Sequence, residues 1–418
     1  MAMFASCTRY NSMVTHPNQL EKKLAAALTV ALGNPKGPAH LSIPVDIFAA
    51  EASGPACHRG LHTLLTADET IVDNCALERL TGEIITVLGN GGRIALLVGH
   101  NAIGAGDLIT RCAELTGADI VTTPRGKPAI NPYHPHARGV FGCSGHASAR
   151  QALADTRVEL ILTVGSNLAE WETSTWDPLL MGNRMVHIDN DRRNFNRSPM
   201  ARLHLFGGIG TIFEQLNSRL EMLRRSGNLA VTMPAQGSAA EQSGYVPPWI
   251  KVSQPDCCAP AANGELLKAP RVYVELIRRL PRETRFFIDN SNSVPWSIHY
   301  FFHPRPEALQ LSIEFATMAW AVGAAVGGAF ANRKAPSVCI AGDGCYLMSA
   351  QEITVAVEQR LPVIFVVLND QAYGLIRHAH RIKGSEAVDF SIPQVDFAMM
   401  ARSTGAQAHT IRCGADFE

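Results

Sequence analysis

Apolar and polar residues follow two repeating patterns along most of the chain. Short apolar runs indicate buried strands, and longer stretches with apolar residues on one side indicate helices. The predicted strands cover residues 94–98, 119–121, 160–164, 185–189, 285–289, 337–341 and 363–368. The predicted helices cover residues 77–88, 105–115, 147–154, 317–332, 350–360 and 395–403. Strands and helices in turn predict an α/β fold with parallel sheets and right-handed crossovers.

Residues 226–270 interrupt this alternation. Pro, Gly, Ser, Ala and Gln dominate there, so we predict a linker. It separates two Rossmann-like or flavodoxin-like parallel-sheet domains, a central one over residues 70–225 and a second over residues 271–418. Residues 1–50 add a helix over 20–31 and a strand over 40–44. One helix and one strand cannot close a core, so we interpret this segment as the tail of a third domain.

The composition narrows the class of protein. Of the 418 residues, 46% are hydrophobic and 18% are charged, which is enough apolar material for large cores. Lys+Arg and Asp+Glu both number 37, so no basic excess favours a nucleic acid or a membrane surface as partner. The ten cysteines are scattered without a Cys-x-x-Cys pair, which favours reduced thiols and a cytoplasmic location. Residues 315–331 carry no charge, but small residues dominate them and favour a buried helix over a membrane span.

The residues most indicative of chemistry follow two consecutive predicted strands. Residues 341–345, Ala-Gly-Asp-Gly-Cys, place Asp343 at the carboxyl end of a strand, where ligands bind in open parallel sheets. The glycines on either side of it let the backbone approach an anion. Asp370 follows the next strand, one crossover later. Two facing carboxylates and phosphate oxygens would make a Mg²⁺ site; the alternative is that both are turn residues at strand ends.

The Gly-Asp-Gly run followed by Asn-Asp resembles the thiamine-diphosphate motif of the acetolactate synthase group. That group includes pyruvate oxidase-like and benzoylformate decarboxylase-like enzymes. Five further stretches resemble other parts of these enzymes. They are 37–46 (the end of the pyrimidine-binding domain), 98–102, 123–127 and 139–142 (the central domain), and 315–325 (the stretch before the motif).

The resemblance implies a role for each matching residue. It implies that Asp343, Asp370 and the carbonyl of Ala372 hold Mg²⁺. Met318 matches a large apolar residue that keeps the cofactor bent, and the Ala316 carbonyl matches the acceptor for its 4′-amino group. Further cofactor-binding positions are implied at Asn292, Ser293, Gly342, Gly344, Cys345, Tyr373, Gly374 and Leu375. Cys345 stands where Ser is frequent, and its S–H is the weaker donor.

The implied activity is decarboxylation of a 2-oxo acid, followed by carboligation or protonation. The bend in the cofactor would place its 4′-nitrogen beside the thiazolium C2–H, so that it serves as its own base. Residues 374–379, Gly-Leu-Ile-Arg-His-Ala, depart from the Gly-Met-Val-x-Gln-Trp of true acetolactate synthases, which implies a different acceptor pocket. His378 is a candidate acid or base in that pocket, or simply a loop histidine.

The resemblance also implies a homodimer or homotetramer, with each active site formed by two subunits. The family's pyrimidine-domain glutamate has no counterpart, so we expect this chain to be a partial one that is inactive alone. A non-catalytic binding or scaffold protein of the same fold is an alternative. An NAD-type oxidoreductase would need a Gly-x-Gly-x-x-Gly turn, which is absent.

The central domain has two further candidate ligands, FAD and zinc. FAD is structural there in synthases, and residues 99–106 are glycine-rich after a strand. They do not form a strict dinucleotide fingerprint, and residues 142–145, Gly-Cys-Ser-Gly, depart from the usual Gly-Met-His-Gly. We therefore expect a nucleotide fold without a flavin. His134, His136 and Cys143 lack an evident fourth ligand, so zinc is not expected.

Overall fold

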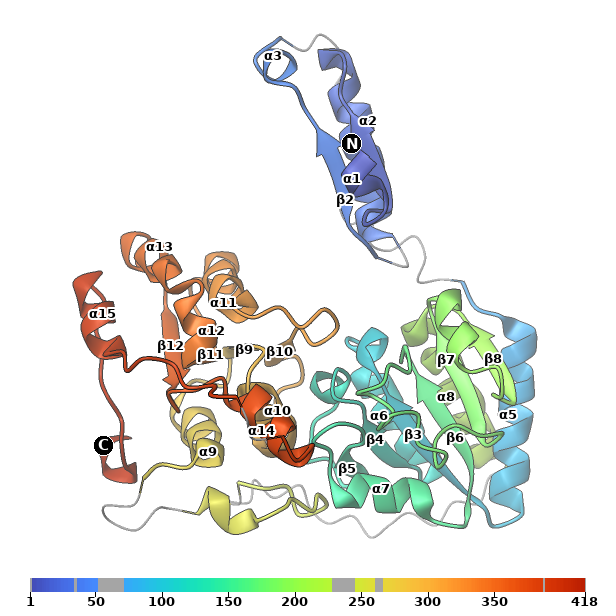
Figure 1. Cartoon of the computed structure of the whole chain (residues 1–418). Coiled ribbons are helices and arrows are strands. Elements are labelled where there is room, and N and C mark those ends of the chain that lie inside the picture. Colours follow the sequence, from blue (N-terminus) through green and yellow to red (C-terminus); the bar gives the residue numbers. More distant parts are fainter. Residues whose placement is uncertain are drawn as a thin grey trace.

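The computed structural model describes residues 2–33, 36–51, 71–227, 245–259, 266–385 and 388–417. Three parts follow one another along the chain, and each contains a sheet (Figure 1). Among the described residues, every pair of named strands is parallel, which confirms the predicted α/β class.

The N-terminal part is small. Strands β1 (Tyr10–Met13) and β2 (Ala39–Ser42) pair, and its helices are α1 (Ala2–Ala5), α2 (Leu20–Leu32) and α3 (Val45–Phe48). Strand β1 was not predicted. Of the described residues in this part, the buried hydrophobic ones are Val14 and Ala27. So few buried side chains agree with the interpretation that this segment does not close a core alone.

The central part is a six-stranded sheet in the order β5-β4-β3-β6-β7-β8. Its strands are β3 (Arg93–Val98), β4 (Asp119–Thr122), β5 (Ala137–Val140), β6 (Val158–Val164), β7 (Met185–Asp189) and β8 (Leu203–Phe206). Helices α5 (Asn74–Gly89), α6 (Gly106–Thr116) and α8 (Ile209–Arg225) pack on one face, and α7 (Ala147–Ala154) packs on the other.

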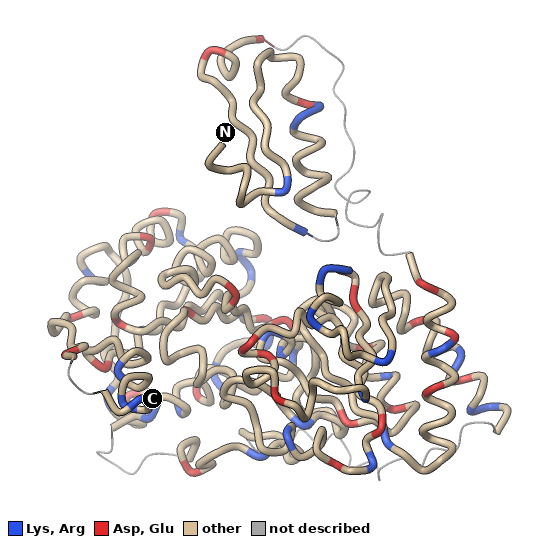
Figure 2. Tube along the Cα trace, turned by 45° about the vertical axis from the view of Figure 1, so that its right-hand side comes forward, with Lys and Arg blue, Asp and Glu red and all other residues tan. Residues whose placement is uncertain are grey.

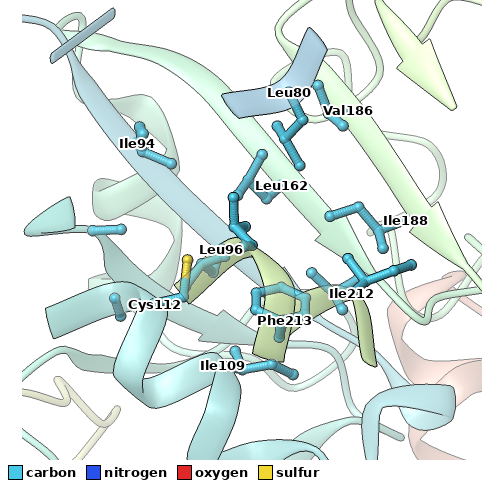
Figure 3. Close-up of a cluster of buried hydrophobic side chains, with 14 of the residues drawn as sticks. Leu80, Ile94, Leu96, Ile109, Cys112, Leu162, Val186, Ile188, Ile212 and Phe213 are labelled. Carbon is cyan, nitrogen blue, oxygen red and sulfur yellow. The ribbon is translucent and has the colours of Figure 1, made fainter. Parts of the chain in front are cut away.

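Strand β3 shows why both faces are covered. Its successive side chains point to opposite sides of the sheet. Leu96 joins Ile109 and Phe213 in the larger core (Figure 3), whereas Leu97 joins the smaller core under α7. A strand buried on both faces appears in the sequence as a continuous apolar run, as predicted for residues 94–98.

The C-terminal part has a four-stranded sheet in the order β10-β9-β11-β12. Its strands are β9 (Arg285–Ile288), β10 (Leu309–Leu311), β11 (Ser337–Gly342) and β12 (Val363–Leu368). Helices α9 (Ala269–Arg279) and α10 (Ser293–Tyr300) cover one face, and α11 (Trp320–Ala331) covers the other. The remaining helices are α12 (Asp343–Leu347), α13 (Ile353–Glu358), α14 (Gly374–Ile382) and α15 (Phe397–Ser403). Acidic and basic residues are interspersed along the whole trace (Figure 2).

Helix α11 corrects one expectation. The uncharged stretch 315–331 was predicted as a buried helix, but the helix begins at Trp320 and Phe315 is 88% exposed. Within α11, small residues do allow close packing, as expected. A Cβ on Gly328 would lie only 2.6 Å from the Phe287 ring. Within the described residues, no helix combines the length and apolarity that a bilayer crossing requires.

The described part of the predicted linker packs on both neighbouring parts. The Lys251 amide donates to Ser148 Oγ of the central part at 2.9 Å. The Ser253 amide donates to His299 Nε2 of the C-terminal part at 2.8 Å, and its carbonyl accepts from the Tyr300 hydroxyl at 2.6 Å. Residues 245–259 therefore connect the two sheets by hydrogen bonds.

The last turn of α10 receives donors from the central part. Lys127 Nζ donates to the carbonyls of Ser297 (2.8 Å) and Ile298 (2.6 Å), and His146 Nε2 donates to that of His299 (2.9 Å). The Ser297 carbonyl also accepts from the Phe301 amide at 3.1 Å, whereas Ile298 and His299 lie in the last turn, where carbonyls lack a helical donor, so the interface supplies one. Because His146 Nδ1 accepts from the Val140 amide at 2.8 Å, this imidazole is neutral with its proton on Nε2.

Burial, helped by the charge of Lys127, lowers the pKa of His146 to about 3. Between that value and the ordinary 6.5, the unfolded chain binds a proton that the folded chain does not, so stability falls as pH decreases. We expect His146 to contribute about 2 kcal/mol to the loss of unfolding free energy between pH 7 and pH 5.

Urea unfolding at both pH values checks this with His146→Asn, which keeps an acceptor for the Val140 amide. The variant should show a pH dependence smaller by about that amount, while substitution of the exposed His409 by Asn should leave it unchanged. An equal pH dependence in wild type and His146→Asn would show that the buried imidazole does not control it.

Candidate functional site

Three loops meet at the carboxyl edge of the C-terminal sheet. Residues 289–293 follow β9, 343–345 follow β11, and 369–374 follow β12. The register aligns the strand ends, because Ile340 lies opposite Ile288 and Gly342 lies opposite Leu368. Parallel strands thus deliver their loops to one side of the sheet, the usual ligand-binding edge.

Asp343 is the first residue of α12, and it is buried. Its Oδ1 accepts from the Gly344 amide and its Oδ2 from the Gln371 amide, both at 2.7 Å. Burial raises the pKa of Asp343, as does the negative charge of Asp370, while these backbone donors act in the opposite direction. The two predicted metal ligands therefore lie near enough to repel one another.

Asp370 is half exposed, and Arg377 Nη2 lies 3.4 Å from its Oδ2. Asn292, a candidate diphosphate ligand, lies close to Asp370 beside Gly374. A Cβ on Gly374 would be 2.3 Å from Asp370 Oδ2 and 2.5 Å from Asn292 Nδ2. The carbonyl of Ala372 accepts from the Gly374 amide at 2.8 Å. Only a residue without a side chain permits this approach of backbone, carboxylate and amide.

The two glycines beside Asp343 are equally constrained. A Cβ on Gly342 would lie 3.1 Å from the Ser291 side chain, and one on Gly344 would lie 2.7 Å from the Tyr373 ring. Cys345 Sγ donates to the Asn290 carbonyl at 3.4 Å, and burial raises the pKa of this thiol to about 12. The thiol is therefore neutral at physiological pH, and the Asn290 carbonyl accepts its one S–H hydrogen.

Asp289 is a structural residue of the site that the sequence did not single out. This buried carboxylate accepts from the amides of Asn290, Ala319 and Ala321, each at 2.8 Å. Ala319, at the start of α11, has no side-chain oxygen to cap the helix, so Asp289 supplies the acceptor from another strand. The signal in the sequence is an Asp directly after an apolar run.

Asn290 holds the segment that leads into α11. Its Nδ2 donates to the carbonyls of Ser312 (2.9 Å) and Thr317 (2.8 Å). Between them lies Ala316, which is exposed and has φ = 56°, in the left-handed region. Met318 is partly buried and packs against the hydrophobic cluster that contains Cys345.

The other candidates lie on two helices. Ser293 begins α10 and is buried, and its Oγ donates to the Asp289 carbonyl at 2.7 Å. Leu375 and His378 are on α14, half-buried and exposed respectively. Among the described residues, no side-chain hydrogen bond, ion pair or ring contact joins His378 to the other candidates. The strand-end candidates are thus brought together, and His378 is not.

The donor set fits a small hard cation. No group of three His, Cys, Asp or Glu side chains that could hold a metal occurs among the described residues. A cation at this edge would instead take the two aspartates, a backbone carbonyl and oxygens of its ligand, which are the ligands Mg²⁺ prefers. A parallel sheet with these groups at its strand ends is typical of α/β proteins that bind phosphorylated ligands.

Comparison with known families makes this assignment specific. Residues 82–216 match the thiamine pyrophosphate enzyme central domain, and residues 289–418 match the thiamine pyrophosphate enzyme C-terminal TPP binding domain. Together the two matches cover well over half of the chain. The chain belongs to the thiamine pyrophosphate-dependent enzymes, among acetolactate synthase-like proteins and related decarboxylases.

Individual relatives are distant but span nearly the whole chain. IlvB2 of Mycobacterium tuberculosis, assigned as an acetolactate synthase large subunit, is 27% identical over 397 residues, covering 92% of this chain and 67% of the relative. The acetolactate synthase isozyme 2 large subunit of Escherichia coli K12 is 22% identical, covering 98% and 70%. The Rhodococcus jostii RHA1 thiamine diphosphate-dependent 4-hydroxybenzoylformate decarboxylase has the same fold, with a TM-score of 0.74 and 18% identity over 98% of this chain and 72% of that one.

Replacement of Asp289 by Ala should leave the buried amides of Ala319 and Ala321 without an acceptor. We expect the free energy of unfolding to fall by about 2–4 kcal/mol, since each orphaned donor costs about 1–3 kcal/mol. Urea unfolding measures this loss.

Asp396→Ala is the matched control, because Asp396 caps the exposed start of α15 through the Met399 amide. Its loss should cost about 1 kcal/mol. A loss for Asp289→Ala no larger than that of the control would contradict the role assigned to Asp289.

Proposed function

We propose that this chain binds thiamine diphosphate through Mg²⁺ at the carboxyl edge of the C-terminal sheet and serves decarboxylation of a 2-oxo acid. The observation that carries the proposal is the adjacency of Asp343 and Asp370 on aligned strand ends, with glycine backbone packed around them. The raised pKa of Asp343 supports a cation there, because a positive charge between the carboxylates would reverse the repulsion.

The proposed roles divide along the edge of the sheet. Asp343, Asp370 and the Ala372 carbonyl hold Mg²⁺. The diphosphate meets Gly342, Gly344, Cys345, Asn292, Ser293 and the turn formed by Tyr373, Gly374 and Leu375. Met318 and the Ala316 carbonyl would contact the rings, and the apolar cluster on which Met318 packs would give them a hydrophobic support. When bound, thiamine diphosphate supplies the electron sink that decarboxylation needs.

The substrate side is proposed from α14. Ala379 stands where acetolactate synthases have a tryptophan, which leaves more room for an acceptor. His378 is exposed on the same helix and is our candidate proton donor or acceptor. Assembly as a homodimer or homotetramer, a cytoplasmic location and inactivity of the chain by itself stay predictions. A CO₂-release assay with pyruvate checks the last of them.

The central domain is proposed to work without a flavin. Its glycines pack against other backbone: a Cβ on Gly99 would lie 2.5 Å from the Gly165 carbonyl, and one on Gly126 would lie 2.0 Å from that of Val98. Asp189, at the end of β7, is occupied by the amide groups of Asn101 (3.1 Å) and Asn194 (3.0 Å). Packing within the protein thus accounts for these glycines.

Isothermal titration with thiamine diphosphate tests the metal site. Binding should require Mg²⁺ and disappear with a chelator. Asp343→Asn should weaken it by at least roughly 100-fold, because even outer-shell changes at metal sites cost about 10- to 100-fold. Asp370→Asn should cost less, because Asp370 is half exposed to solvent whereas Asp343 is buried.

Glu358→Gln, on the exposed end of α13 in the same domain, is the control and should bind as wild type does. Equal binding with and without Mg²⁺, or by Asp343→Asn and wild type, would refute the proposed site. Binding of the cofactor with no turnover of any 2-oxo acid by the assembled enzyme would favour the scaffold alternative.

A further inference from the structure

Glu314 connects the two large domains at the candidate site. It lies in the segment between β10 and α11, which also carries Ala316 and Met318. Its Oε1 accepts from Arg125 Nη1 at 3.1 Å and from Asn167 Nδ2 at 2.7 Å. Arg125 follows β4 and Asn167 follows β6, so two strand ends of the central sheet converge on one carboxylate of the C-terminal domain.

The central-domain side of this contact consists of two partly buried residues, Arg125 and Asn167. Arg125 is only 15% exposed, and its charge opposes the effect of burial, which raises the pKa of the nearby Glu172. Glu172 is fixed in turn, accepting from Thr123 Oγ1 at 3.2 Å and from Ser166 Oγ at 2.8 Å. A fixed, buried carboxylate thus lies near the cation that meets Glu314.

The segment that Glu314 anchors is conformationally costly. Ala316 and Ala319 have φ of 56° and 68°, a region that costs a residue with a Cβ about 1–2 kcal/mol. Such conformations persist where surrounding contacts over-determine them. Asp289 and Asn290 supply such contacts from within the C-terminal domain. Glu314 adds one to the central domain, through Arg125.

The exposure of Glu314 decides what this contact is for. Its side chain is 64% exposed, and an ion pair so open to solvent is worth about 0–1 kcal/mol of stability. That is too little to hold two domains together. It can add to the contacts of Asp289 and Asn290 and shift the conformational equilibrium of a short strained segment by up to about fivefold.

We infer that Glu314 is a positioning residue through which the central domain sets the backbone at Ala316 and Met318. This inference rests on the proposed function, because those residues face the rings of thiamine diphosphate. It predicts that Glu314 controls recognition of the rings and not of the diphosphate, which is held by the loops after β9, β11 and β12.

Two ligands separate these roles in isothermal titration with Mg²⁺ present. Glu314→Ala should weaken binding of thiamine diphosphate by about fivefold and change binding of inorganic diphosphate by less than twofold. Glu314→Gln keeps an oxygen for Asn167 and should recover part of the loss. Arg125→Gln should weaken thiamine diphosphate alone, as Glu314→Ala does, and Glu358→Ala should alter neither ligand.

Each outcome decides the inference. Selective loss of thiamine diphosphate binding supports it. Unchanged binding of thiamine diphosphate by Glu314→Ala overturns it, and so does an equal loss of both ligands, which a general structural defect would produce. If wild type binds neither ligand, the proposed function itself fails and the inference falls with it, a result distinct from the other two.

Discussion

The candidate site depends on the register of β9, β11 and β12, which aligns the carboxyl ends of the three strands. Parallel pairing from Ser337 to Gly342 fixes the height of three loops that are distant in sequence. Asp289, one residue beyond β9, then accepts from the amide at the start of α11 and ties that helix to the sheet. The positions of Asp343, Asp370 and the segment 312–319 all follow from this register, because each is attached within a few residues of an aligned strand end.

Unfavourable local features gather at this edge. Asp289 and Asp343 are buried carboxylates, and Gln371 as well as Ala316 has a left-handed backbone. Each costs free energy alone, but backbone amides satisfy both carboxylates at 2.7–2.8 Å. Violations of local rules are expected at functional sites, where geometry matters more than stability. Buried carboxylates and left-handed residues thus occur together at this edge of the sheet, as they often do at ligand-binding sites.

The sequence predicted those features that depend on local pattern. Continuous apolar runs located β6, β7 and β12, and the glycines around Asp343 marked its strand end. Helix α8 was missed although Ile212, Phe213 and Leu216 have helical spacing, so its signal was present. Strand β10, three residues paired only with β9, has too short a pattern to detect. Asp289 and Glu314 act on partners 30 or more positions away, and no local periodicity reports such contacts.

The central domain reaches the candidate site by two routes. One is through Glu314. The other is α10, whose last carbonyls accept from Lys127 and His146 and whose first residue, Ser293, is bonded to the loop of Asp289. An eight-residue helix is a rigid rod of about 12 Å, so fixing one end fixes the other. Arg125 and Asn167, which follow two strands of the central sheet, contact Glu314, so this edge of the central domain faces the C-terminal domain and frames the candidate site.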